Sequence, residues 1–180
     1  VSTLNFSSPP KNEKGAVDFS QDYFGRETFL SVSGQLEAET FAVGGLGRVY
    51  TFGPTFRSEN SHTARHLSEF WMVEPEAAFF NLDDNANLAA HYVKFLIQKA
   101  VEHCQNELEF LSSRYAPDNL KTLNNVLESK FEKVTYTDAI KILEEASAHR
   151  KFDFQVKWGI DLQTEHERFL AEEYFKRPTI

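Results

Sequence analysis

The residues best suited to chemistry lie in two segments that read as β-strands, Arg48–Phe56 and Glu69–Phe79. Alternate residues of a strand point the same way. If the two strands pair, one face of the sheet therefore presents a cation, an aromatic ring and several carboxylates. These residues are Thr55, Arg57 and Glu59 in and just after the first strand, and Phe70, Met72, Glu74 and Glu76 in the second.

Such a face suits a nucleotide. An arginine offers a planar, permanently charged fork for phosphate oxygens, an aromatic ring stacks on a base, and a carboxylate accepts from an exocyclic amine. His62, Arg65 and His66 lie on the connecting stretch and could reach outer phosphates. The alternative is a solvated hairpin whose charges form ordinary surface ion pairs.

The elements that position these residues are an antiparallel strand pair with a long polar connection, Asn60–Ser68, of a length that is more often functional than a simple turn. Aromatic and β-branched residues predict the two strands. Thr28–Ser33 is a further short strand candidate, and residues 1–27 read as loop and turn.

Apolar residues then recur at helical spacing. They predict one helix over Asp83–Leu111, capped by Asn81 or Asp83, a second near Asp118–Phe131, and a third that Thr137 caps and that runs to about Ala146. Alternation predicts a strand over Phe152–Ile160, and a capping box formed by Thr164 and Glu167 predicts a last helix through Phe175. Strand pairs followed by helices favour an α+β fold, an antiparallel sheet flanked by helices.

Composition narrows the class of protein. The formal net charge is −8, which argues against a simple basic nucleic-acid module without excluding a tRNA partner. The single cysteine, Cys104, permits neither an intrachain disulfide nor a cysteine-based zinc site. No apolar run is long enough to cross a membrane. The chain starts at Val1 without a signal-like segment, which predicts a cytoplasmic piece of a longer protein.

The exact residue sequence of the hairpin is more specific than its alternation of polar and aromatic residues. The run from Gly53 to Phe70 reads Gly-Pro-Thr-Phe-Arg-Ser-Glu-Asn-Ser-His-Thr-Ala-Arg-His-Leu-Ser-Glu-Phe. It resembles the second signature motif of class II aminoacyl-tRNA synthetases, in the branch of the aspartyl, asparaginyl and lysyl enzymes. The resemblance implies an ATP-binding hairpin and an α+β catalytic core.

The resemblance also implies roles for single residues. Arg57 would hold the α-phosphate of ATP and the carboxylate of the amino acid, and Glu59 would meet the adenine amino group or the end of the tRNA. His66 and Arg65 would lie towards the outer phosphates, and Phe70 would stack on adenine. Arg57, Glu59 and His66 are the catalytic candidates. The implied reaction forms an aminoacyl-adenylate and then transfers the acyl group to tRNA, which requires positioning and charge neutralisation rather than a protein nucleophile.

Two features favour asparagine as the amino acid. Ser33-Gly34-Gln35-Leu36 resembles bacterial-type asparaginyl enzymes, whereas the aspartyl and lysyl enzymes usually have Ser-Pro-Gln-Leu, and Glu74 lies where the aspartyl enzyme typically has Asp. No lysine follows Gln35 to neutralise a carboxylate ligand, and Glu74 could accept from an amide NH₂. Ser33, Gln35 and Glu74 are therefore the expected amino-acid contacts.

The resemblance covers nearly the whole chain and implies a partial catalytic domain over residues 1–180, with a mainly helical insertion over residues 83–146. The anticodon-binding OB domain, the dimer-forming first motif and the C-terminal ATP-site motif are missing from it. The Mg²⁺ ligands are expected outside this chain, and the site residues named above include no metal ligand. The full-length enzyme is expected to be a homodimer that acts on asparagine and tRNA(Asn), and the isolated chain is expected to be inactive.

Three alternatives stay open. One is an ammonia-dependent asparagine synthetase on the same scaffold, and another is an aspartyl-tRNA synthetase; both bind aspartate. The third is a non-catalytic synthetase-like module. The presence of all four expected ATP-site residues argues against it; these are Arg57, Glu59, His66 and Phe70.

Overall fold

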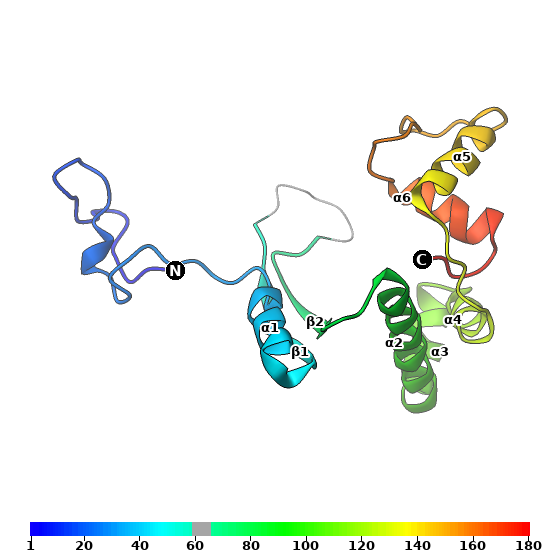
Figure 1. The fold of residues 1–180 in the computed structure, drawn as a ribbon, viewed down its shortest axis with the longest axis horizontal. Coiled ribbons are helices and arrows are strands. Elements are labelled where there is room, and N and C mark those ends of the chain that lie inside the picture. Colours follow the sequence, from blue (N-terminus) through cyan, green and yellow to red (C-terminus); the bar gives the residue numbers. More distant parts are fainter. Residues whose placement is uncertain (59–65) are drawn as a thin grey trace. The chain divides into compact units, whose positions relative to one another are not determined.

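The computed structural model describes residues 1–58 and 66–180 and divides into two compact units, residues 1–80 and 81–180 (Figure 1). In its described residues the first unit holds a two-stranded antiparallel sheet, one short α-helix, a 3₁₀-helix and a π-helix, and the second unit is built from helices. The predicted α+β class is confirmed. No described helix is both long enough and apolar enough to cross a membrane.

The sheet of the first unit pairs β1 (Arg48–Phe56) with β2 (Glu69–Ala77). Thr55 lies opposite Phe70, and Thr51 lies opposite Glu74. Burial alternates along both strands, so that Thr51, Thr55, Phe70 and Glu74 belong to the more protected face. The predicted strands are therefore confirmed, with β2 ending two residues earlier than expected. Their shared polar face is confirmed for the residues within the strands, whereas Glu59 lies outside the described part of the chain.

Residues 28–41 differ from the prediction. Thr28–Ser33 forms no regular strand, and among the described residues it shares one backbone bond with the hairpin, from the Phe56 N–H to the Ser31 carbonyl at 3.1 Å. After it, α1 (Gln35–Phe41) contacts both strands and continues as a π-helix over Ala42–Leu46. This helix was not predicted, because its seven residues are too few for a periodic signal.

In residues 1–27, predicted as loop and turn, a 3₁₀-helix over Phe19–Gln21 is the only helix. The segment is organised by the buried carboxylate of Asp22. Its Oδ1 accepts from the Thr3 N–H at 2.8 Å, the Thr3 hydroxyl at 2.6 Å and the Tyr23 N–H at 2.7 Å. These hydrogen bonds lower the pKa of Asp22 far below its usual range.

The first predicted helix of the second unit is two helices, α2 (Leu82–His103) and α3 (Gln105–Arg114). They meet at Cys104, whose φ of −124° and ψ of 38° interrupt the helical path, although neither glycine nor proline marks the break. Asn81 caps α2 as predicted, in a capping box with Asp84. The next helix, α4 (Asn119–Glu128), follows the predicted pattern but ends three residues earlier.

The core of the second unit lies beneath α5 (Tyr136–Ser147), which starts one residue before the predicted cap at Thr137 because Thr135 caps it instead. Leu143 is fully buried in a cluster with Ala139, Phe152 and Leu170. The cluster joins α5 to the end of the chain, where α6 (Thr164–Arg168) leads into a π-helix over Phe169–Tyr174.

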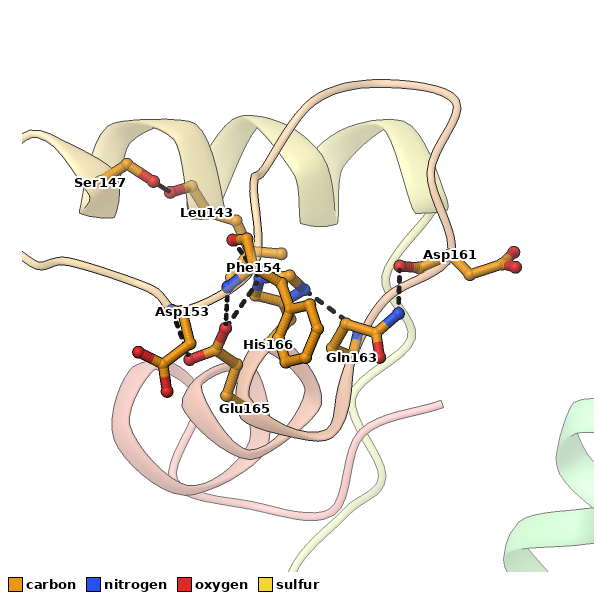
Figure 2. A network of polar contacts seen from close by, with 8 residues as sticks. All are labelled: Leu143, Ser147, Asp153, Phe154, Asp161, Gln163, Glu165 and His166. Atoms are coloured by element: carbon orange, nitrogen blue, oxygen red, sulfur yellow. Dashed lines mark hydrogen bonds and ion pairs between the residues drawn. The ribbon is translucent and has the colours of Figure 1, made fainter. Parts of the chain in front are cut away.

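The predicted strand over Phe152–Ile160 is wrong, because side chains rather than a neighbouring strand bind its backbone (Figure 2). The Glu165 carboxylate accepts from the N–H groups of Asp153 at 3.1 Å and Phe154 at 2.8 Å. The fully buried ring of His166 accepts from the Gln163 N–H through Nδ1 at 3.1 Å. With Nδ1 an acceptor in the neutral ring, Nε2 carries the proton and donates to the Phe154 carbonyl at 3.3 Å. The capping box of α6 therefore joins Gln163 to His166, one residue before the predicted pair.

We expect the L143A substitution to reduce the free energy of unfolding by about 2–5 kcal/mol, because it leaves a cavity in the core. Urea denaturation of the chain measures this loss. The control is L82A, since Leu82 is 85% exposed and its truncation should change stability by about 0.5 kcal/mol or less. Equal losses in the two variants would contradict the core assigned to α5.

The Glu165 carboxylate predicts a pH-dependent contribution to stability. The Phe154 N–H, followed by that of Asp153, lowers the pKa of Glu165 in spite of partial burial. The contribution is therefore fully present above the ordinary glutamate pKa of about 4.3 and disappears as the pH falls through the lower folded-state pKa. We expect E165Q to lower the urea midpoint at neutral pH, and its difference from the wild type to shrink as the solution is acidified.

The matched control for E165Q is E144Q, which changes an exposed glutamate of α5. Its urea midpoint should follow the wild type at every pH. A gap between E165Q and the wild type that stays constant below the folded-state pKa would rule out the carboxylate as its source.

Candidate functional site

The centre of the candidate site is the carboxylate of Glu74 on β2. Its Oε2 accepts from the Gly34 N–H at 3.0 Å and from the Thr51 hydroxyl at 2.8 Å. Its Oε1 accepts a short hydrogen bond from the Ser33 hydroxyl. Three donors from β1 and from the segment before α1 thus converge on one side chain.

Ser33 and Gly34 can donate to Glu74 because the chain turns at this point into α1. The Ser33 hydroxyl oxygen also accepts from the Gln35 N–H at 3.0 Å, and the Gly34 carbonyl accepts the first bond of the helix from the Ala38 N–H at 3.0 Å. Gly34 lies so close to β1 that a Cβ on it would come within 2.8 Å of both Cγ2 and Oγ1 of Thr51. The close approach requires glycine at this position.

Two carboxylates on the same face of β2 have opposite pKa shifts. The hydrogen bonds from Ser33 and Gly34 lower the pKa of Glu74 against the opposing effect of burial, with smaller contributions from Thr51 and the charge of Arg57. Burial raises the pKa of Glu76, as do the charges of Glu39 and Glu74. Glu74 is consequently an anion and an acceptor at neutral pH.

The cation and the ring of the predicted nucleotide face lie together at the other end of the hairpin. The Arg57 guanidinium carbon is 5.6 Å from the centroid of the Phe70 ring. Its Nε donates to the Val32 carbonyl at 3.4 Å, and its terminal nitrogen lies 3.9 Å from the Met72 sulfur. Backbone bonds support this corner, since the Arg57 N–H donates to the Ser68 carbonyl at 3.0 Å.

The structure brings Ser33, Arg57, Phe70 and Glu74 together on one side of the hairpin. Gln35 lies next to Ser33, but its side-chain amide donates to Glu39 at 2.9 Å and is exposed. His66 is exposed just before β2. The predicted roles of Glu59 and Arg65 fall on residues outside the part of the chain that the structure describes.

Two residues of the site escaped the sequence reasoning, Gly34 as a backbone donor and Thr51 as a hydroxyl donor. In the sequence, Gly34 stands out only as part of Ser33-Gly34-Gln35-Leu36, and Thr51 is one residue of the predicted strand Arg48–Phe56. The period of two places Thr51 on the same face as Thr55, which is the one signal that could have indicated it.

A guanidinium beside an aromatic ring fits a phosphate and a base, so the residues present fit ATP. The described residues include no cluster of three or more His, Cys, Asp or Glu side chains arranged to hold a metal ion.

Comparisons with known proteins agree with this geometry. A family model described as tRNA synthetases class II (D, K and N) matches residues 7–179. The asparagine–tRNA ligase of Shewanella sediminis is 53% identical over 180 residues, and that of Protochlamydia amoebophila is 50% identical. All of this chain is covered in both alignments, but it spans only 38% of the length of either relative.

A solved structure is also similar. It is asparaginyl-tRNA synthetase from Pyrococcus horikoshii complexed with asparaginyl-adenylate, with a TM-score of 0.72 and 38% identity. The alignment covers 87% of this chain and 33% of that one.

Proposed function

We propose a function from one premise: the chain belongs to the class II tRNA synthetase family that serves aspartate (D), lysine (K) and asparagine (N). The family match confirms the resemblance carried by the run from Gly53 to Phe70. Our proposal is that the chain is part of the catalytic domain of an asparagine–tRNA ligase. This enzyme activates asparagine with ATP to asparaginyl-adenylate and transfers the asparaginyl group to tRNA(Asn).

The observation that carries the choice of asparagine is the anionic carboxylate of Glu74. A carboxylate is an acceptor only, so it pairs with the NH₂ of a carboxamide and repels a second carboxylate. Asparagine and aspartate differ in just this group. The relatives' names support the same choice.

The other residues then have roles in binding and orientation. Arg57 binds the α-phosphate and the carboxylate of asparagine, which lets that carboxylate attack phosphorus while pyrophosphate leaves. Phe70 stacks on adenine, and Glu59, Arg65 and His66 serve the adenine, the tRNA end and the outer phosphates. Ser33 and Gln35 complete the amino-acid pocket. Mg²⁺ would neutralise phosphate charge, with its ligands outside this chain.

The remaining features of the proposal concern the whole protein. We place it in the cytoplasm as a homodimer with no membrane association. The hairpin supplies one wall of an ATP site, and the chain spans 38% of the length of the relatives. We therefore expect this chain alone to show no asparagine-dependent exchange of pyrophosphate into ATP, measured at concentrations at which the full-length protein is active.

In the full-length protein that contains this chain, we expect R57A to reduce asparagine-dependent pyrophosphate exchange by at least about 100-fold, because a charge that stabilises the transition state is lost. The matched control is R48A. Arg48 lies 5.1 Å from the Phe80 ring at the far end of the same hairpin, so R48A removes a similar cation–ring contact and should keep near-wild-type exchange.

Two results would overturn the proposal. Exchange that depends on aspartate instead of asparagine would favour the aspartyl-tRNA synthetase or, if asparagine then forms from aspartate and ammonia, the asparagine synthetase. A folded full-length protein without any amino-acid-dependent exchange would favour the non-catalytic module.

A further inference from the structure

We infer that Gly34 and Thr51 are positioning residues that set the side-chain specificity of the site, because together they hold Glu74 in the orientation that accepts a carboxamide. This inference rests on the proposed function. Neither residue needs to touch the substrate, since each acts through Glu74.

Most acceptor positions of the Glu74 carboxylate are occupied by donors of the described residues. An ionised carboxylate offers about four lone-pair positions. Gly34 and Thr51 occupy the two on Oε2, at 3.0 Å and 2.8 Å, and Ser33 occupies one on Oε1. One position on Oε1 is left for an N–H of a ligand.

The donors to Glu74 also have fixed positions. The Ser33 hydroxyl oxygen accepts from the Gln35 N–H at 3.0 Å, which leaves its proton for Glu74. The Gly34 N–H belongs to the backbone at the start of α1. Thr51 is β-branched and sits within a paired strand opposite Glu74, which restricts the χ1 angle and hence the position of its hydroxyl oxygen.

The positions of Gly34 and Thr51 depend on each other. A Cβ at position 34 would meet Cγ2 and Oγ1 of Thr51 at 2.8 Å, closer than real Cβ atoms approach, and the Thr51 Cβ at 3.0 Å, which is also unusually tight. The backbone φ of Gly34 is −94°, which any residue adopts. Contact with Thr51, and not backbone strain, therefore demands glycine. A side chain at position 34 must displace either the segment or the Thr51 side chain, and either shift disturbs a hydrogen bond to Glu74.

The chemical consequence concerns discrimination. Three donors keep Glu74 ionised and fixed, and an ionised, fixed acceptor distinguishes a carboxamide from a carboxylate. With one donor removed, the carboxylate gains rotational freedom and holds its charge less strongly. Asparagine then loses a well-placed partner, whereas aspartate loses part of the repulsion that excluded it.

The test uses the full-length protein and amino-acid-dependent pyrophosphate exchange with asparagine and with aspartate. T51V removes the hydroxyl and keeps the shape, while T51S keeps the hydroxyl. We expect T51V to raise the KM for asparagine about 10- to 100-fold, as for loss of a hydrogen bond to a charged group. The KM for ATP should not change, the preference for asparagine over aspartate should fall about tenfold or more, and T51S should restore most of both values.

G34A provides a second, independent variant. It should raise the KM for asparagine at least about tenfold, while G44A is the matched control, because a Cβ on Gly44 meets nothing within 4 Å. Since T51A removes the two Thr51 atoms that a Cβ at position 34 would meet at 2.8 Å, the loss in G34A/T51A should be smaller than the product of the two single losses.

The outcomes separate this inference from the proposed function. A wild type without asparagine-dependent exchange would refute the function itself. An active wild type with unchanged KM and unchanged preference in T51V and G34A would overturn the inference alone, as would parallel increases in the KM for asparagine and ATP. Should T51V fail to fold, the pair of G34A and G44A decides the same question.

Discussion

The candidate site depends on one interaction, the convergence of three donors on the carboxylate of Glu74. Ser33 and Gly34 come from the segment before α1, and Thr51 comes from β1, so a single side chain of β2 joins that segment to both strands. A two-stranded hairpin is at best marginally stable in water. Hydrogen bonds to an ionised group are stronger than those between neutral groups, and these three fix the path of the segment that carries the expected amino-acid contacts.

The same interaction gives different surroundings to two carboxylates on one face of β2. Glu74 and Glu76 lie two residues apart on one face of β2. Hydrogen-bond donors surround Glu74 and lower its pKa. The pKa of Glu76 is raised by burial and by the negative charges of Glu39 and Glu74. The charge of Arg57 adds to the lowering of the Glu74 pKa. The two carboxylates thus have different surroundings, which is compatible with the proposed site for an amide beside a phosphate.

Sequence reasoning succeeded where local pattern and packing agree. Aromatic and β-branched residues predicted β1 and β2, and the helical period predicted α4, α5 and most of α2 and α3. It failed where side chains replaced regular backbone pairing. The alternation from Phe152 to Ile160 is real, but Glu165 and His166 bind that backbone, and such contacts between positions about 12 residues apart leave no periodic signal. Likewise, no glycine or proline marks the break between α2 and α3 at Cys104.

The sequence predicted which residue types form the site, but it did not predict which residues they contact. Arg57 and Phe70 were expected to bind phosphate and adenine separately, yet the guanidinium lies over the ring at 5.6 Å. The two roles remain compatible, because an aromatic ring has two faces and a cation on one leaves the other for a base. The Val32 carbonyl, 3.4 Å from Nε, also holds only one nitrogen of the guanidinium. Arg57 thus keeps donors for a phosphate while its position beside Phe70 is set by the segment that Glu74 anchors.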